Sequence, residues 1–301
     1  MFENPQLCCL PLNGCSTKEE QRMYLVTGAT GNVGSKIAEG LLNHGKQVRL
    51  FLRNPDKYQP LATRGEVSVG DFTKQETFRP ALEGIKAVFL MNRGPDQNGF
   101  AKFVDTARES GVEKIVFLST LAAADPSLTI GKMHKQQEDI IRESGMTATL
   151  LRPGGFMSNT FGWIGSIKAE GRVYNAMGTG RFAPVAPTDI AAVGIRALTE
   201  ELTEEILNIT GDELTTVAEQ VGILSGVIGR KLECIDLSEE EAVQAMVKGG
   251  LPQFLAAAVV ESFRDIRQGG TAPMFNTVEK VTGQKPIAFR TWAKQNESRF
   301  V

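Results

Sequence analysis

The chain is poor in the residues that build metal centres and disulfide frameworks. Its 301 residues include four cysteines and two histidines, and three of the cysteines, Cys8, Cys9 and Cys15, lie near the amino terminus. Their spacing lacks the second ligand pair that a zinc site needs, and so large a chain with so few cysteines is not built on disulfides. We therefore expect no metal site, and reduced thiols of the kind found in cytoplasmic proteins.

A strong charge of one sign and a long apolar run are also missing. The formal net charge of −2 argues against nucleic acid or an anionic membrane as partner. The most apolar segment, residues 254–260, is far too short to cross a bilayer, and residues 1–22 lack the pattern of a secretory signal. We expect a cytoplasmic protein that acts on a small molecule, and the sequence leaves a homodimer open.

The most informative segment that is present covers residues 24–34, which read Y-L-V-T-G-A-T-G-N-V-G. An apolar run of β type leads into three glycines, Gly28, Gly31 and Gly34, and a helical pattern follows over residues 35–42. In a phosphate-binding turn, the first glycine lets the chain leave the strand, the second makes room for a diphosphate, and the third lets the helix pack closely. A dinucleotide site is therefore predicted, with a plain tight turn as the alternative. Its other expected members are Thr27, Thr30, Asn32 and Val33.

Strand and helix patterns alternate through the first half of the chain. Further strands are expected over 48–52, 67–69, 87–90, 114–118 and 148–151, and helices over 31–43, 74–82, 97–110 and 133–144. Short β-rich runs separated by helices imply βαβ units and a parallel sheet. Right-handed crossovers then give an α/β, doubly wound sheet with its ligand crevice at the carboxyl ends of the strands.

The pattern becomes helix-rich after Arg152. Strands are expected over 206–209 and 232–235, and helices over 216–228, 238–248, 253–268 and 288–299, with one more starting near Thr188. We therefore expect three parts. These are a flexible arm over 1–22, a nucleotide-binding domain over 23–152, and a smaller substrate lobe over 153–301, of which 188–210 return to the first domain.

Together these motifs resemble the NmrA-like, atypical branch of the short-chain dehydrogenase/reductase superfamily. The matching pieces are T-G-A-T-G-N-V-G, R-N-P after the second strand, G-D-F after the third, S-G-M-T-A-T-L-L-R-P-G-G-F-M-S-N around the sixth, and G-R-K-L in the later half. The branch includes NADPH:quinone oxidoreductases, triphenylmethane and azo-dye reductases, ergot-alkaloid reductases and redox-sensing regulators. The resemblance spans the chain from Met23 and implies a Rossmann fold.

The end of the second strand bears on the choice of cofactor. An NAD site places an acidic residue there, to hold both ribose hydroxyls, and this sequence has none. Arg53 offers instead a planar cation for a 2′-phosphate, and Lys57 and Arg64 are candidate helpers. NADPH is therefore predicted in preference to NADH, with a solvated surface arginine as the alternative.

The resemblance also implies contacts further along the chain. Asp71, after the third strand, would accept a hydrogen bond from the adenine amino group, or else cap the next helix. Asn92 follows the fourth strand at the edge of the crevice. Arg152 and Pro153 follow the sixth strand, in a loop that closes over the nicotinamide in the family.

The catalytic tyrosine of typical short-chain reductases is missing. Residues 130–138 read I-G-K-M-H-K-Q-Q-E and resemble the Y-G-x-x-K-x-x-x-E stretch of the extended branch. In that register Ile130 replaces the tyrosine and His134 the lysine. An imidazole with a pKa of about 6.5 can bond a ribose hydroxyl or relay a proton, so His134 is the predicted catalytic residue. Ser119 and Lys132 complete the predicted set, and each of the three has a plain structural or solvated alternative.

Aromatic and apolar residues follow the sixth strand. Phe156, Met157, Phe161 and Trp163 are predicted to wall a substrate cavity, with core packing as the alternative. Two functions are open. One is an NADPH-dependent reductase that passes a hydride to a small conjugated apolar acceptor, such as a quinone, enone, imine or dye. The other is a non-catalytic NADP(H)-sensing regulator of the NmrA type, which the missing tyrosine favours.

Overall fold

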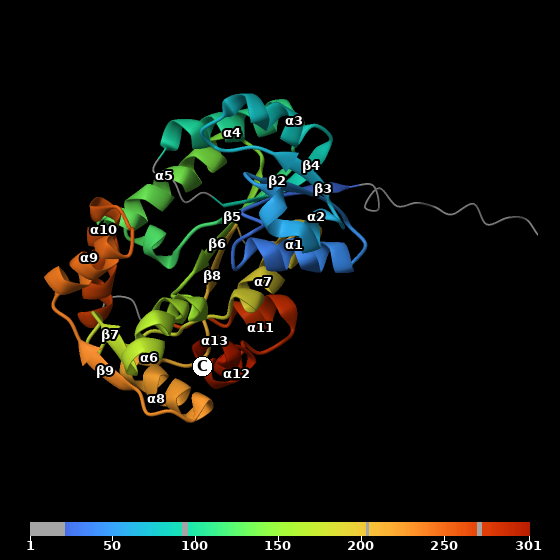
Figure 1. The fold of residues 1–301 in the computed structure, drawn as a ribbon. Coiled ribbons are helices and arrows are strands. Elements are labelled where there is room, and N and C mark those ends of the chain that lie inside the picture. Colours follow the sequence, from blue (N-terminus) through green and yellow to red (C-terminus); the bar gives the residue numbers. More distant parts are fainter. Residues whose placement is uncertain (1–21, 92–95, 203–204, 270–272) are drawn as a thin grey trace, which may run out of the picture.

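A seven-stranded parallel sheet forms the centre of the molecule (Figure 1). The computed structural model describes residues 22–91, 96–202, 205–269 and 273–301. The strand order is β3-β2-β1-β4-β5-β6-β8, so β1 pairs with both β2 and β4. The order reverses at β1, and this places the crevice of a doubly wound fold at the carboxyl ends of β1 and β4. The strands are β1 (Met23–Thr27), β2 (Gln47–Leu52), β3 (Glu66–Val69), β4 (Ile85–Leu90), β5 (Lys114–Leu118), β6 (Thr147–Pro153) and β8 (Ile206–Ile209).

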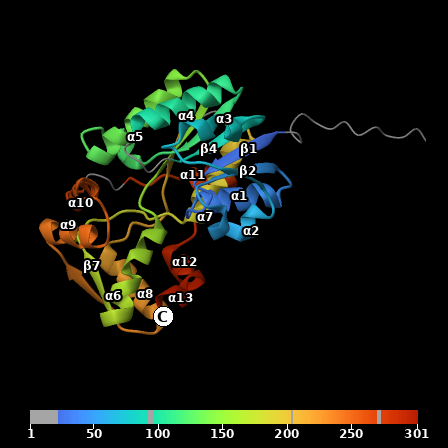
Figure 2. The same ribbon diagram turned by 45° about the horizontal axis from the view of Figure 1, so that its top comes forward.

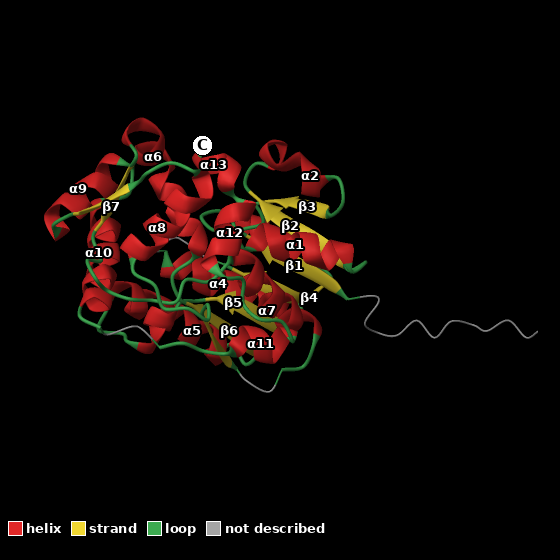
Figure 3. Cartoon of the chain, turned by 90° about the horizontal axis from the view of Figure 1, so that it is seen from below, coloured by secondary structure: helices red, strands yellow, loops and turns green. Residues whose placement is uncertain are grey.

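Helices cover both faces of this sheet, and the alternation of side chains along the strands explains why (Figures 1 and 3). In β1, Tyr24 and Val26 point into one apolar cluster, while Leu25 points into the other. The first cluster packs against α1 and α7, and the second against α3, α4 and α5. These helices are α1 (Gly34–Asn43), α3 (Phe78–Leu82), α4 (Gln97–Glu109), α5 (Thr129–Glu143) and α7 (Pro187–Thr199).

The later part of the chain builds a second, helix-rich region with an apolar core of its own (Figure 2). Its two strands, β7 (Arg172–Asn175) and β9 (Glu233–Asp236), form a separate parallel pair. Thr216 and Ser238 start two of its helices through capping boxes with the glutamates three residues later. The helices are α6 (Ile164–Glu170), α8 (Val217–Ile228), α9 (Glu239–Lys248), α10 (Gln253–Arg267), α12 (Phe289–Gln295) and α13 (Glu297–Phe300).

The fold class is as predicted. After α6 and β7 of the helix-rich region, the chain returns to the seven-stranded sheet, where α7 covers one face and β8 pairs with β6. The short elements are where the predictions were wrong. Strand β7 was not expected, the helix expected over 74–82 is a 3₁₀ turn (Gln75–Thr77) followed by α3, and the one expected over 288–299 breaks at Asn296. Helix α5 begins four residues early because Glu261 of α10 accepts the Thr129 N–H at 2.8 Å. Among the described residues, each helix is too short or too polar to cross a bilayer.

Candidate active site

The glycine turn between β1 and α1 has the backbone that its sequence predicts. Gly28 adopts φ +62°, which favours glycine, and its carbonyl accepts the Gly31 N–H at 2.8 Å. A Cβ on Gly34 would lie 2.3 Å from the Gly28 oxygen. Side chains are therefore excluded at Gly28 by conformation and at Gly34 by the close approach of the helix to the turn.

The start of α1 suits an anion. Its N-cap residue, the buried Val33, provides no side-chain cap, and the first turn of α1 holds no acidic residue. Thr30 and Asn32 are exposed, and Asn32 Nδ2 donates to Ser158 Oγ at 3.1 Å, which ties the turn to the segment after β6. Backbone N–H groups and the helix dipole are thus left for a ligand phosphate, so the turn fits the diphosphate of a dinucleotide.

Thr27 has a structural contact that the sequence did not reveal. Its side chain is fully buried, its hydroxyl oxygen accepts the Met91 N–H at 2.8 Å, and the hydroxyl lies 3.2 Å from the Phe89 carbonyl oxygen. The hydroxyl thereby fastens the end of β1 to the end of β4. A direct cofactor contact from Thr27 stays a prediction.

Arg53 and Asp71 face each other beyond β2 and β3. The Arg53 side chain is 83% exposed, and its Nε lies 3.9 Å from Asp71 Oδ2. Asp71 Oδ1 accepts from both the backbone N–H and the hydroxyl of Thr73 at 2.9 Å. The Thr73 backbone bond, and to a smaller extent Arg53, hold the pKa of Asp71 below its usual value. Asp71 therefore makes a local turn and caps no helix, because the N-cap position of the following turn is Lys74.

Of the two helpers proposed for Arg53, Arg64 does not lie beside it. Arg64 Nη2 donates to Asn43 Oδ1 at 2.8 Å, where α1 ends and just before β3 begins. Arg64 thus lies at the amino edge of the sheet, opposite the crevice, and its proposed role is corrected. The Lys57 side chain and Asn92 lie outside the described residues.

A buried ionic network lies behind the ends of β5 and β6. Glu138 of α5 is completely buried and accepts from Arg152 Nε at 2.8 Å and from Arg152 Nη2 at 2.5 Å. Ser119 Oγ donates to the same carboxylate at 2.6 Å, while its backbone N–H bonds the Leu151 carbonyl at 2.8 Å. The charge of Arg152 is therefore neutralised inside the protein by Glu138. The Ser119 hydroxyl proton is already donated to the same carboxylate.

Sequence reasoning assigned no role to Glu138. Two signals pointed to it: it matches the final glutamate of the Y-G-x-x-K-x-x-x-E stretch, and it lies four residues after His134, on the same face of a helix. Arg152 and Ser119 were predicted as direct contacts of cofactor and substrate. In the structure each is bound to Glu138, and Pro153 follows Arg152 as the last residue of β6.

His134 lies one turn before Glu138, with its ring centroid 6.1 Å from that of Phe117. Its Nδ1 is buried and has no hydrogen-bond partner among the described residues. Burial lowers the pKa of His134, and the nearby Glu138 opposes that shift only in part. The ring is therefore neutral at pH 7. Lys132, two residues away and so on the far side of the helix, has an exposed side chain and does not reach this network.

A cavity of about 490 Å³ begins directly after β6, at Gly155 and Phe156, and extends to α9 and α10. Of the four residues predicted to wall it, Phe156 and Trp163 do. Met157 is buried in the core of the helix-rich region, and Phe161 packs on Trp292 with ring centroids 5.2 Å apart. For these two residues the core-packing alternative is the correct one.

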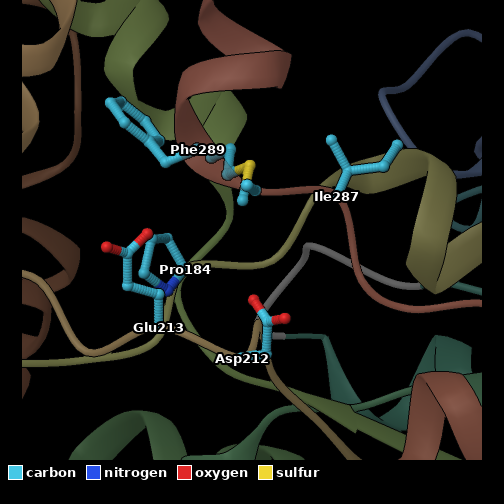
Figure 4. A pocket seen from close by; sticks show the side chains of 7 residues that line it. Pro184, Asp212, Glu213, Ile287 and Phe289 are labelled. Atoms are coloured by element: carbon cyan, nitrogen blue, oxygen red, sulfur yellow. The ribbon is translucent and has the colours of Figure 1, made fainter.

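Much of the cavity wall comes from segments that the sequence did not connect with β6. The apolar members from these segments include Met177, Phe182, Leu237, Met246, Phe263 and Ile266. A second depression, with Pro184, Asp212 and Glu213 on one side and Ile287 and Phe289 on the other, encloses no ligand-sized volume (Figure 4). The larger cavity is therefore the candidate substrate site.

Comparison with known proteins agrees with this geometry. A family model described as NAD(P)H-binding matches residues 28–201. A (4-alkanoyl-5-oxo-2,5-dihydrofuran-3-yl)methyl phosphate reductase of Streptomyces griseus is 34% identical, over 92% of this chain and 99% of the relative. An NAD(P)H azoreductase of Xenophilus azovorans is 31% identical, with the same coverage of both chains.

The solved structures extend the likeness to three dimensions. The NADPH complex of an NADPH-dependent quinone oxidoreductase from Escherichia coli superposes with a TM-score of 0.80. It is 26% identical in sequence and covers 91% of this chain and 99% of its own. This chain therefore belongs to the NAD(P)H-binding family and is an NAD(P)H-dependent oxidoreductase.

Proposed function

We propose that the protein is an NADPH-dependent reductase of a small, conjugated, apolar acceptor. The observation that supports this most directly is the cavity of about 490 Å³, which begins two residues after β6. A cavity of this size holds a small organic molecule, and its wall is largely apolar. A quinone, an enone, an imine or a dye would fit that description.

The cofactor would be held by the parts of the chain already described. The glycine turn and the start of α1 would bind the diphosphate, and Arg53 would pair with the 2′-phosphate that distinguishes NADPH from NADH. When bound, the nicotinamide supplies the hydride. Phe156 and Trp163 would hold the acceptor and exclude water from it, so that orientation provides most of the rate.

The state of the polar residues fits an acceptor that needs little acid catalysis. Ser119 donates its proton to Glu138, so it has none to offer a substrate. His134 is neutral at pH 7, so it would act as a relay for a proton from water and not as a standing acid. Conjugated acceptors that take a hydride readily are compatible with such a site.

An acceptor panel tests the proposal. NADPH absorbance would be followed with menadione, an azo dye and a cyclic imine, and at least one of them should be consumed in proportion to enzyme. Gly34→Val serves as the matched control, because a side chain at Gly34 would meet the Gly28 carbonyl and spoil the turn. No consumption of any acceptor, with NADPH binding shown by calorimetry, would contradict reductase function.

That result would favour the second candidate, an NADP(H)-sensing regulator. Two observations favour it: no tyrosine stands at position 130, and Ser119 and Arg152 are both held by Glu138. A sensor would distinguish oxidised from reduced dinucleotide and would need no acceptor cavity. Because this structure has one, we place the reductase first.

Cofactor preference gives a separate prediction. Arg53→Ala should weaken NADPH binding about tenfold while changing NADH little, because the lost guanidinium would face only the 2′-phosphate. Arg64→Ala is the matched control: it removes the same charge from the opposite edge of the sheet and should change neither affinity. Fluorescence titration with both nucleotides measures the effect. Equal weakening of NADPH and NADH binding by Arg53→Ala would contradict the pairing of Arg53 with the 2′-phosphate.

A further inference from the structure

Most polar side chains of the cavity wall have their hydrogen-bonding groups already engaged. Thr160 Oγ1 donates to the Met157 carbonyl at 2.8 Å, and Ser166 Oγ donates to the Trp163 carbonyl at 3.1 Å. Tyr174 donates its phenol proton to Glu170 at 2.9 Å. These groups complete the protein's own structure and leave no donor for a bound molecule.

The buried amide of Asn175 is used at both ends. Its Nδ2 donates to the Gly178 carbonyl at 3.0 Å and to Asp236 at 2.8 Å, and its Oδ1 accepts the Met177 N–H at 2.8 Å. An amide has two donor hydrogens and a carbonyl oxygen, and here each has a partner. Asn175 therefore shapes the cavity wall, and its amide has no free hydrogen-bonding group for a bound substrate.

Two amides of the wall remain. Asn159 is exposed, so water can satisfy it, whereas Gln220 of α8 is buried. Only 2% of the residue is exposed, it lines the cavity, and its Nε2 donates to Thr215 Oγ1 at 3.1 Å. Its Oε1 has no partner among the described residues. Six side-chain atoms of the described residues are both inaccessible and without a hydrogen-bond partner, and Gln220 Oε1 is not among them. This oxygen must therefore border open space. The open space next to Gln220 is the cavity.

The charge of the wall gives a second, independent observation. Among the described residues that line the cavity there is no Lys, Arg, Asp or Glu. An anion placed there would lose hydration and gain no cation in return, which weakens its binding. A neutral molecule would lose little, and one with a single hydrogen-bond donor would satisfy an oxygen that is otherwise unpaired.

We propose that Gln220 determines substrate specificity, by accepting a hydrogen bond from an O–H or N–H group of a neutral acceptor. The inference rests on the proposed reductase function and narrows it to uncharged acceptors with such a donor. The uncharged wall disfavours sulfonated or phosphorylated acceptors. The rest of the acceptor lies against apolar residues such as Phe156, Phe182 and Phe263.

Three related naphthoquinones test this: menadione, its analogue with a hydroxymethyl group in place of the methyl, and the corresponding sulfonate. Each would be titrated into protein saturated with NADP⁺, so that no turnover occurs. Binding would be followed by quenching of the tryptophan fluorescence, since Trp163, one of the two tryptophans, lines the cavity. We expect the hydroxymethyl compound to bind about three- to tenfold more tightly than menadione, as one hydrogen bond provides. The sulfonate should bind at least tenfold more weakly than menadione.

Substitution at Gln220 then isolates the contact. Gln220→Met, of similar shape, should abolish the preference for the hydroxymethyl compound and leave menadione binding within about twofold. Retained menadione binding, with an unchanged circular dichroism spectrum and thermal unfolding midpoint, guards against a folding defect in this variant. Gln244→Leu, at an exposed position of α9 whose neighbours line the cavity, is the control and should change nothing.

Equal binding of the hydroxymethyl compound and menadione by the unchanged protein would overturn the inference, as would tight binding of the sulfonate. Loss of both neutral quinones in Gln220→Met, with an unchanged circular dichroism spectrum, would also overturn it. The reductase proposal would stand in each case if the acceptor panel is reduced. If no acceptor in that panel is reduced, both the reductase proposal and the inference about Gln220 are contradicted.

Discussion

Replacing Glu138 by Gln should lower the free energy of unfolding by about 3–5 kcal/mol, because Arg152 would be left charged and without its counter-ion inside the protein. The carboxylate is completely buried and accepts from both Nε and Nη2 of Arg152. The glutamine side chain has nearly the same shape as glutamate. The loss of unfolding free energy therefore reports the missing charge and not a cavity. Urea unfolding followed by circular dichroism gives the value.

The double variant Glu138→Gln, Arg152→Met separates this pair from general damage. With both charges gone there is no unpaired ion, and most of the lost stability should return. A double variant that is as unstable as the sum of the two single variants would show that the ion pair does not carry the effect. Lys135→Met is the matched control, since it removes an ion pair at the surface of the same helix and should cost at most about 1 kcal/mol.

The same network explains why β6 ends where the site begins. Glu138 joins α5 to β6 through Arg152, and to the residue after β5 through Ser119. The chain that leaves β6 provides Gly155 and Phe156 to the cavity. The ion pair therefore fixes the strand end from which the cavity wall starts, and it does so without placing a net charge beside the proposed apolar acceptor.

The sheet could be predicted from the sequence because its signals are local. Apolar runs, the helices between them and the glycines at the turns are each complete within a few residues, and the crossover rule then fixes the topology. The turn from Gly28 to Gly34 was readable for the same reason. Its requirements, a positive φ at Gly28 and the absence of a Cβ at Gly34, depend on neighbours within the turn.

The site was harder to predict because its contacts join distant segments. Glu261 caps a helix that starts 132 residues earlier, and β7 pairs with a strand 61 residues later. Arg64 looked suitable as a cation near β3, but its position before that strand, and not after it, puts it at the wrong edge. The cavity wall is a property of the tertiary structure, so periodicity could not separate Trp163, which lines it, from Phe161, which does not.

Asp189 should make the protein less stable as the pH rises, which is the reverse of the usual behaviour of a carboxylate. It lies in the first turn of α7, is 7% exposed, and its Oδ2 accepts the Ile287 N–H at 2.8 Å. Burial raises the pKa of Asp189 from 3.8 to about 6, the bond from Ile287 opposes this, and the charge of Asp212 adds to it. Asp212 belongs to the depression beside Ile287 (Figure 4).

The direction follows from proton linkage. Between pH 3.8 and about 6 the folded protein holds a proton on Asp189 that the unfolded chain has lost, so the unfolding free energy falls as the pH rises through this window. A shift of this size corresponds to about 2–3 kcal/mol. Asp189→Asn keeps an oxygen that accepts from Ile287 and never ionises. It should therefore be about 2–3 kcal/mol more stable than the unchanged protein above the window, with the gap closing toward its lower end.

Urea unfolding at several pH values measures that gap, and Asp212→Asn is the comparison. Removing the Asp212 charge takes away only the smaller of the two effects that raise the Asp189 pKa, so its gain should be smaller and should open through the same window. A constant gap between Asp189→Asn and the unchanged protein at all pH values would mean that the amide packs differently, because a titration cannot produce a difference independent of pH. A gap that opens through the window identifies Asp189 as a buried charge that weakens the attachment of the carboxyl-terminal helices to α7.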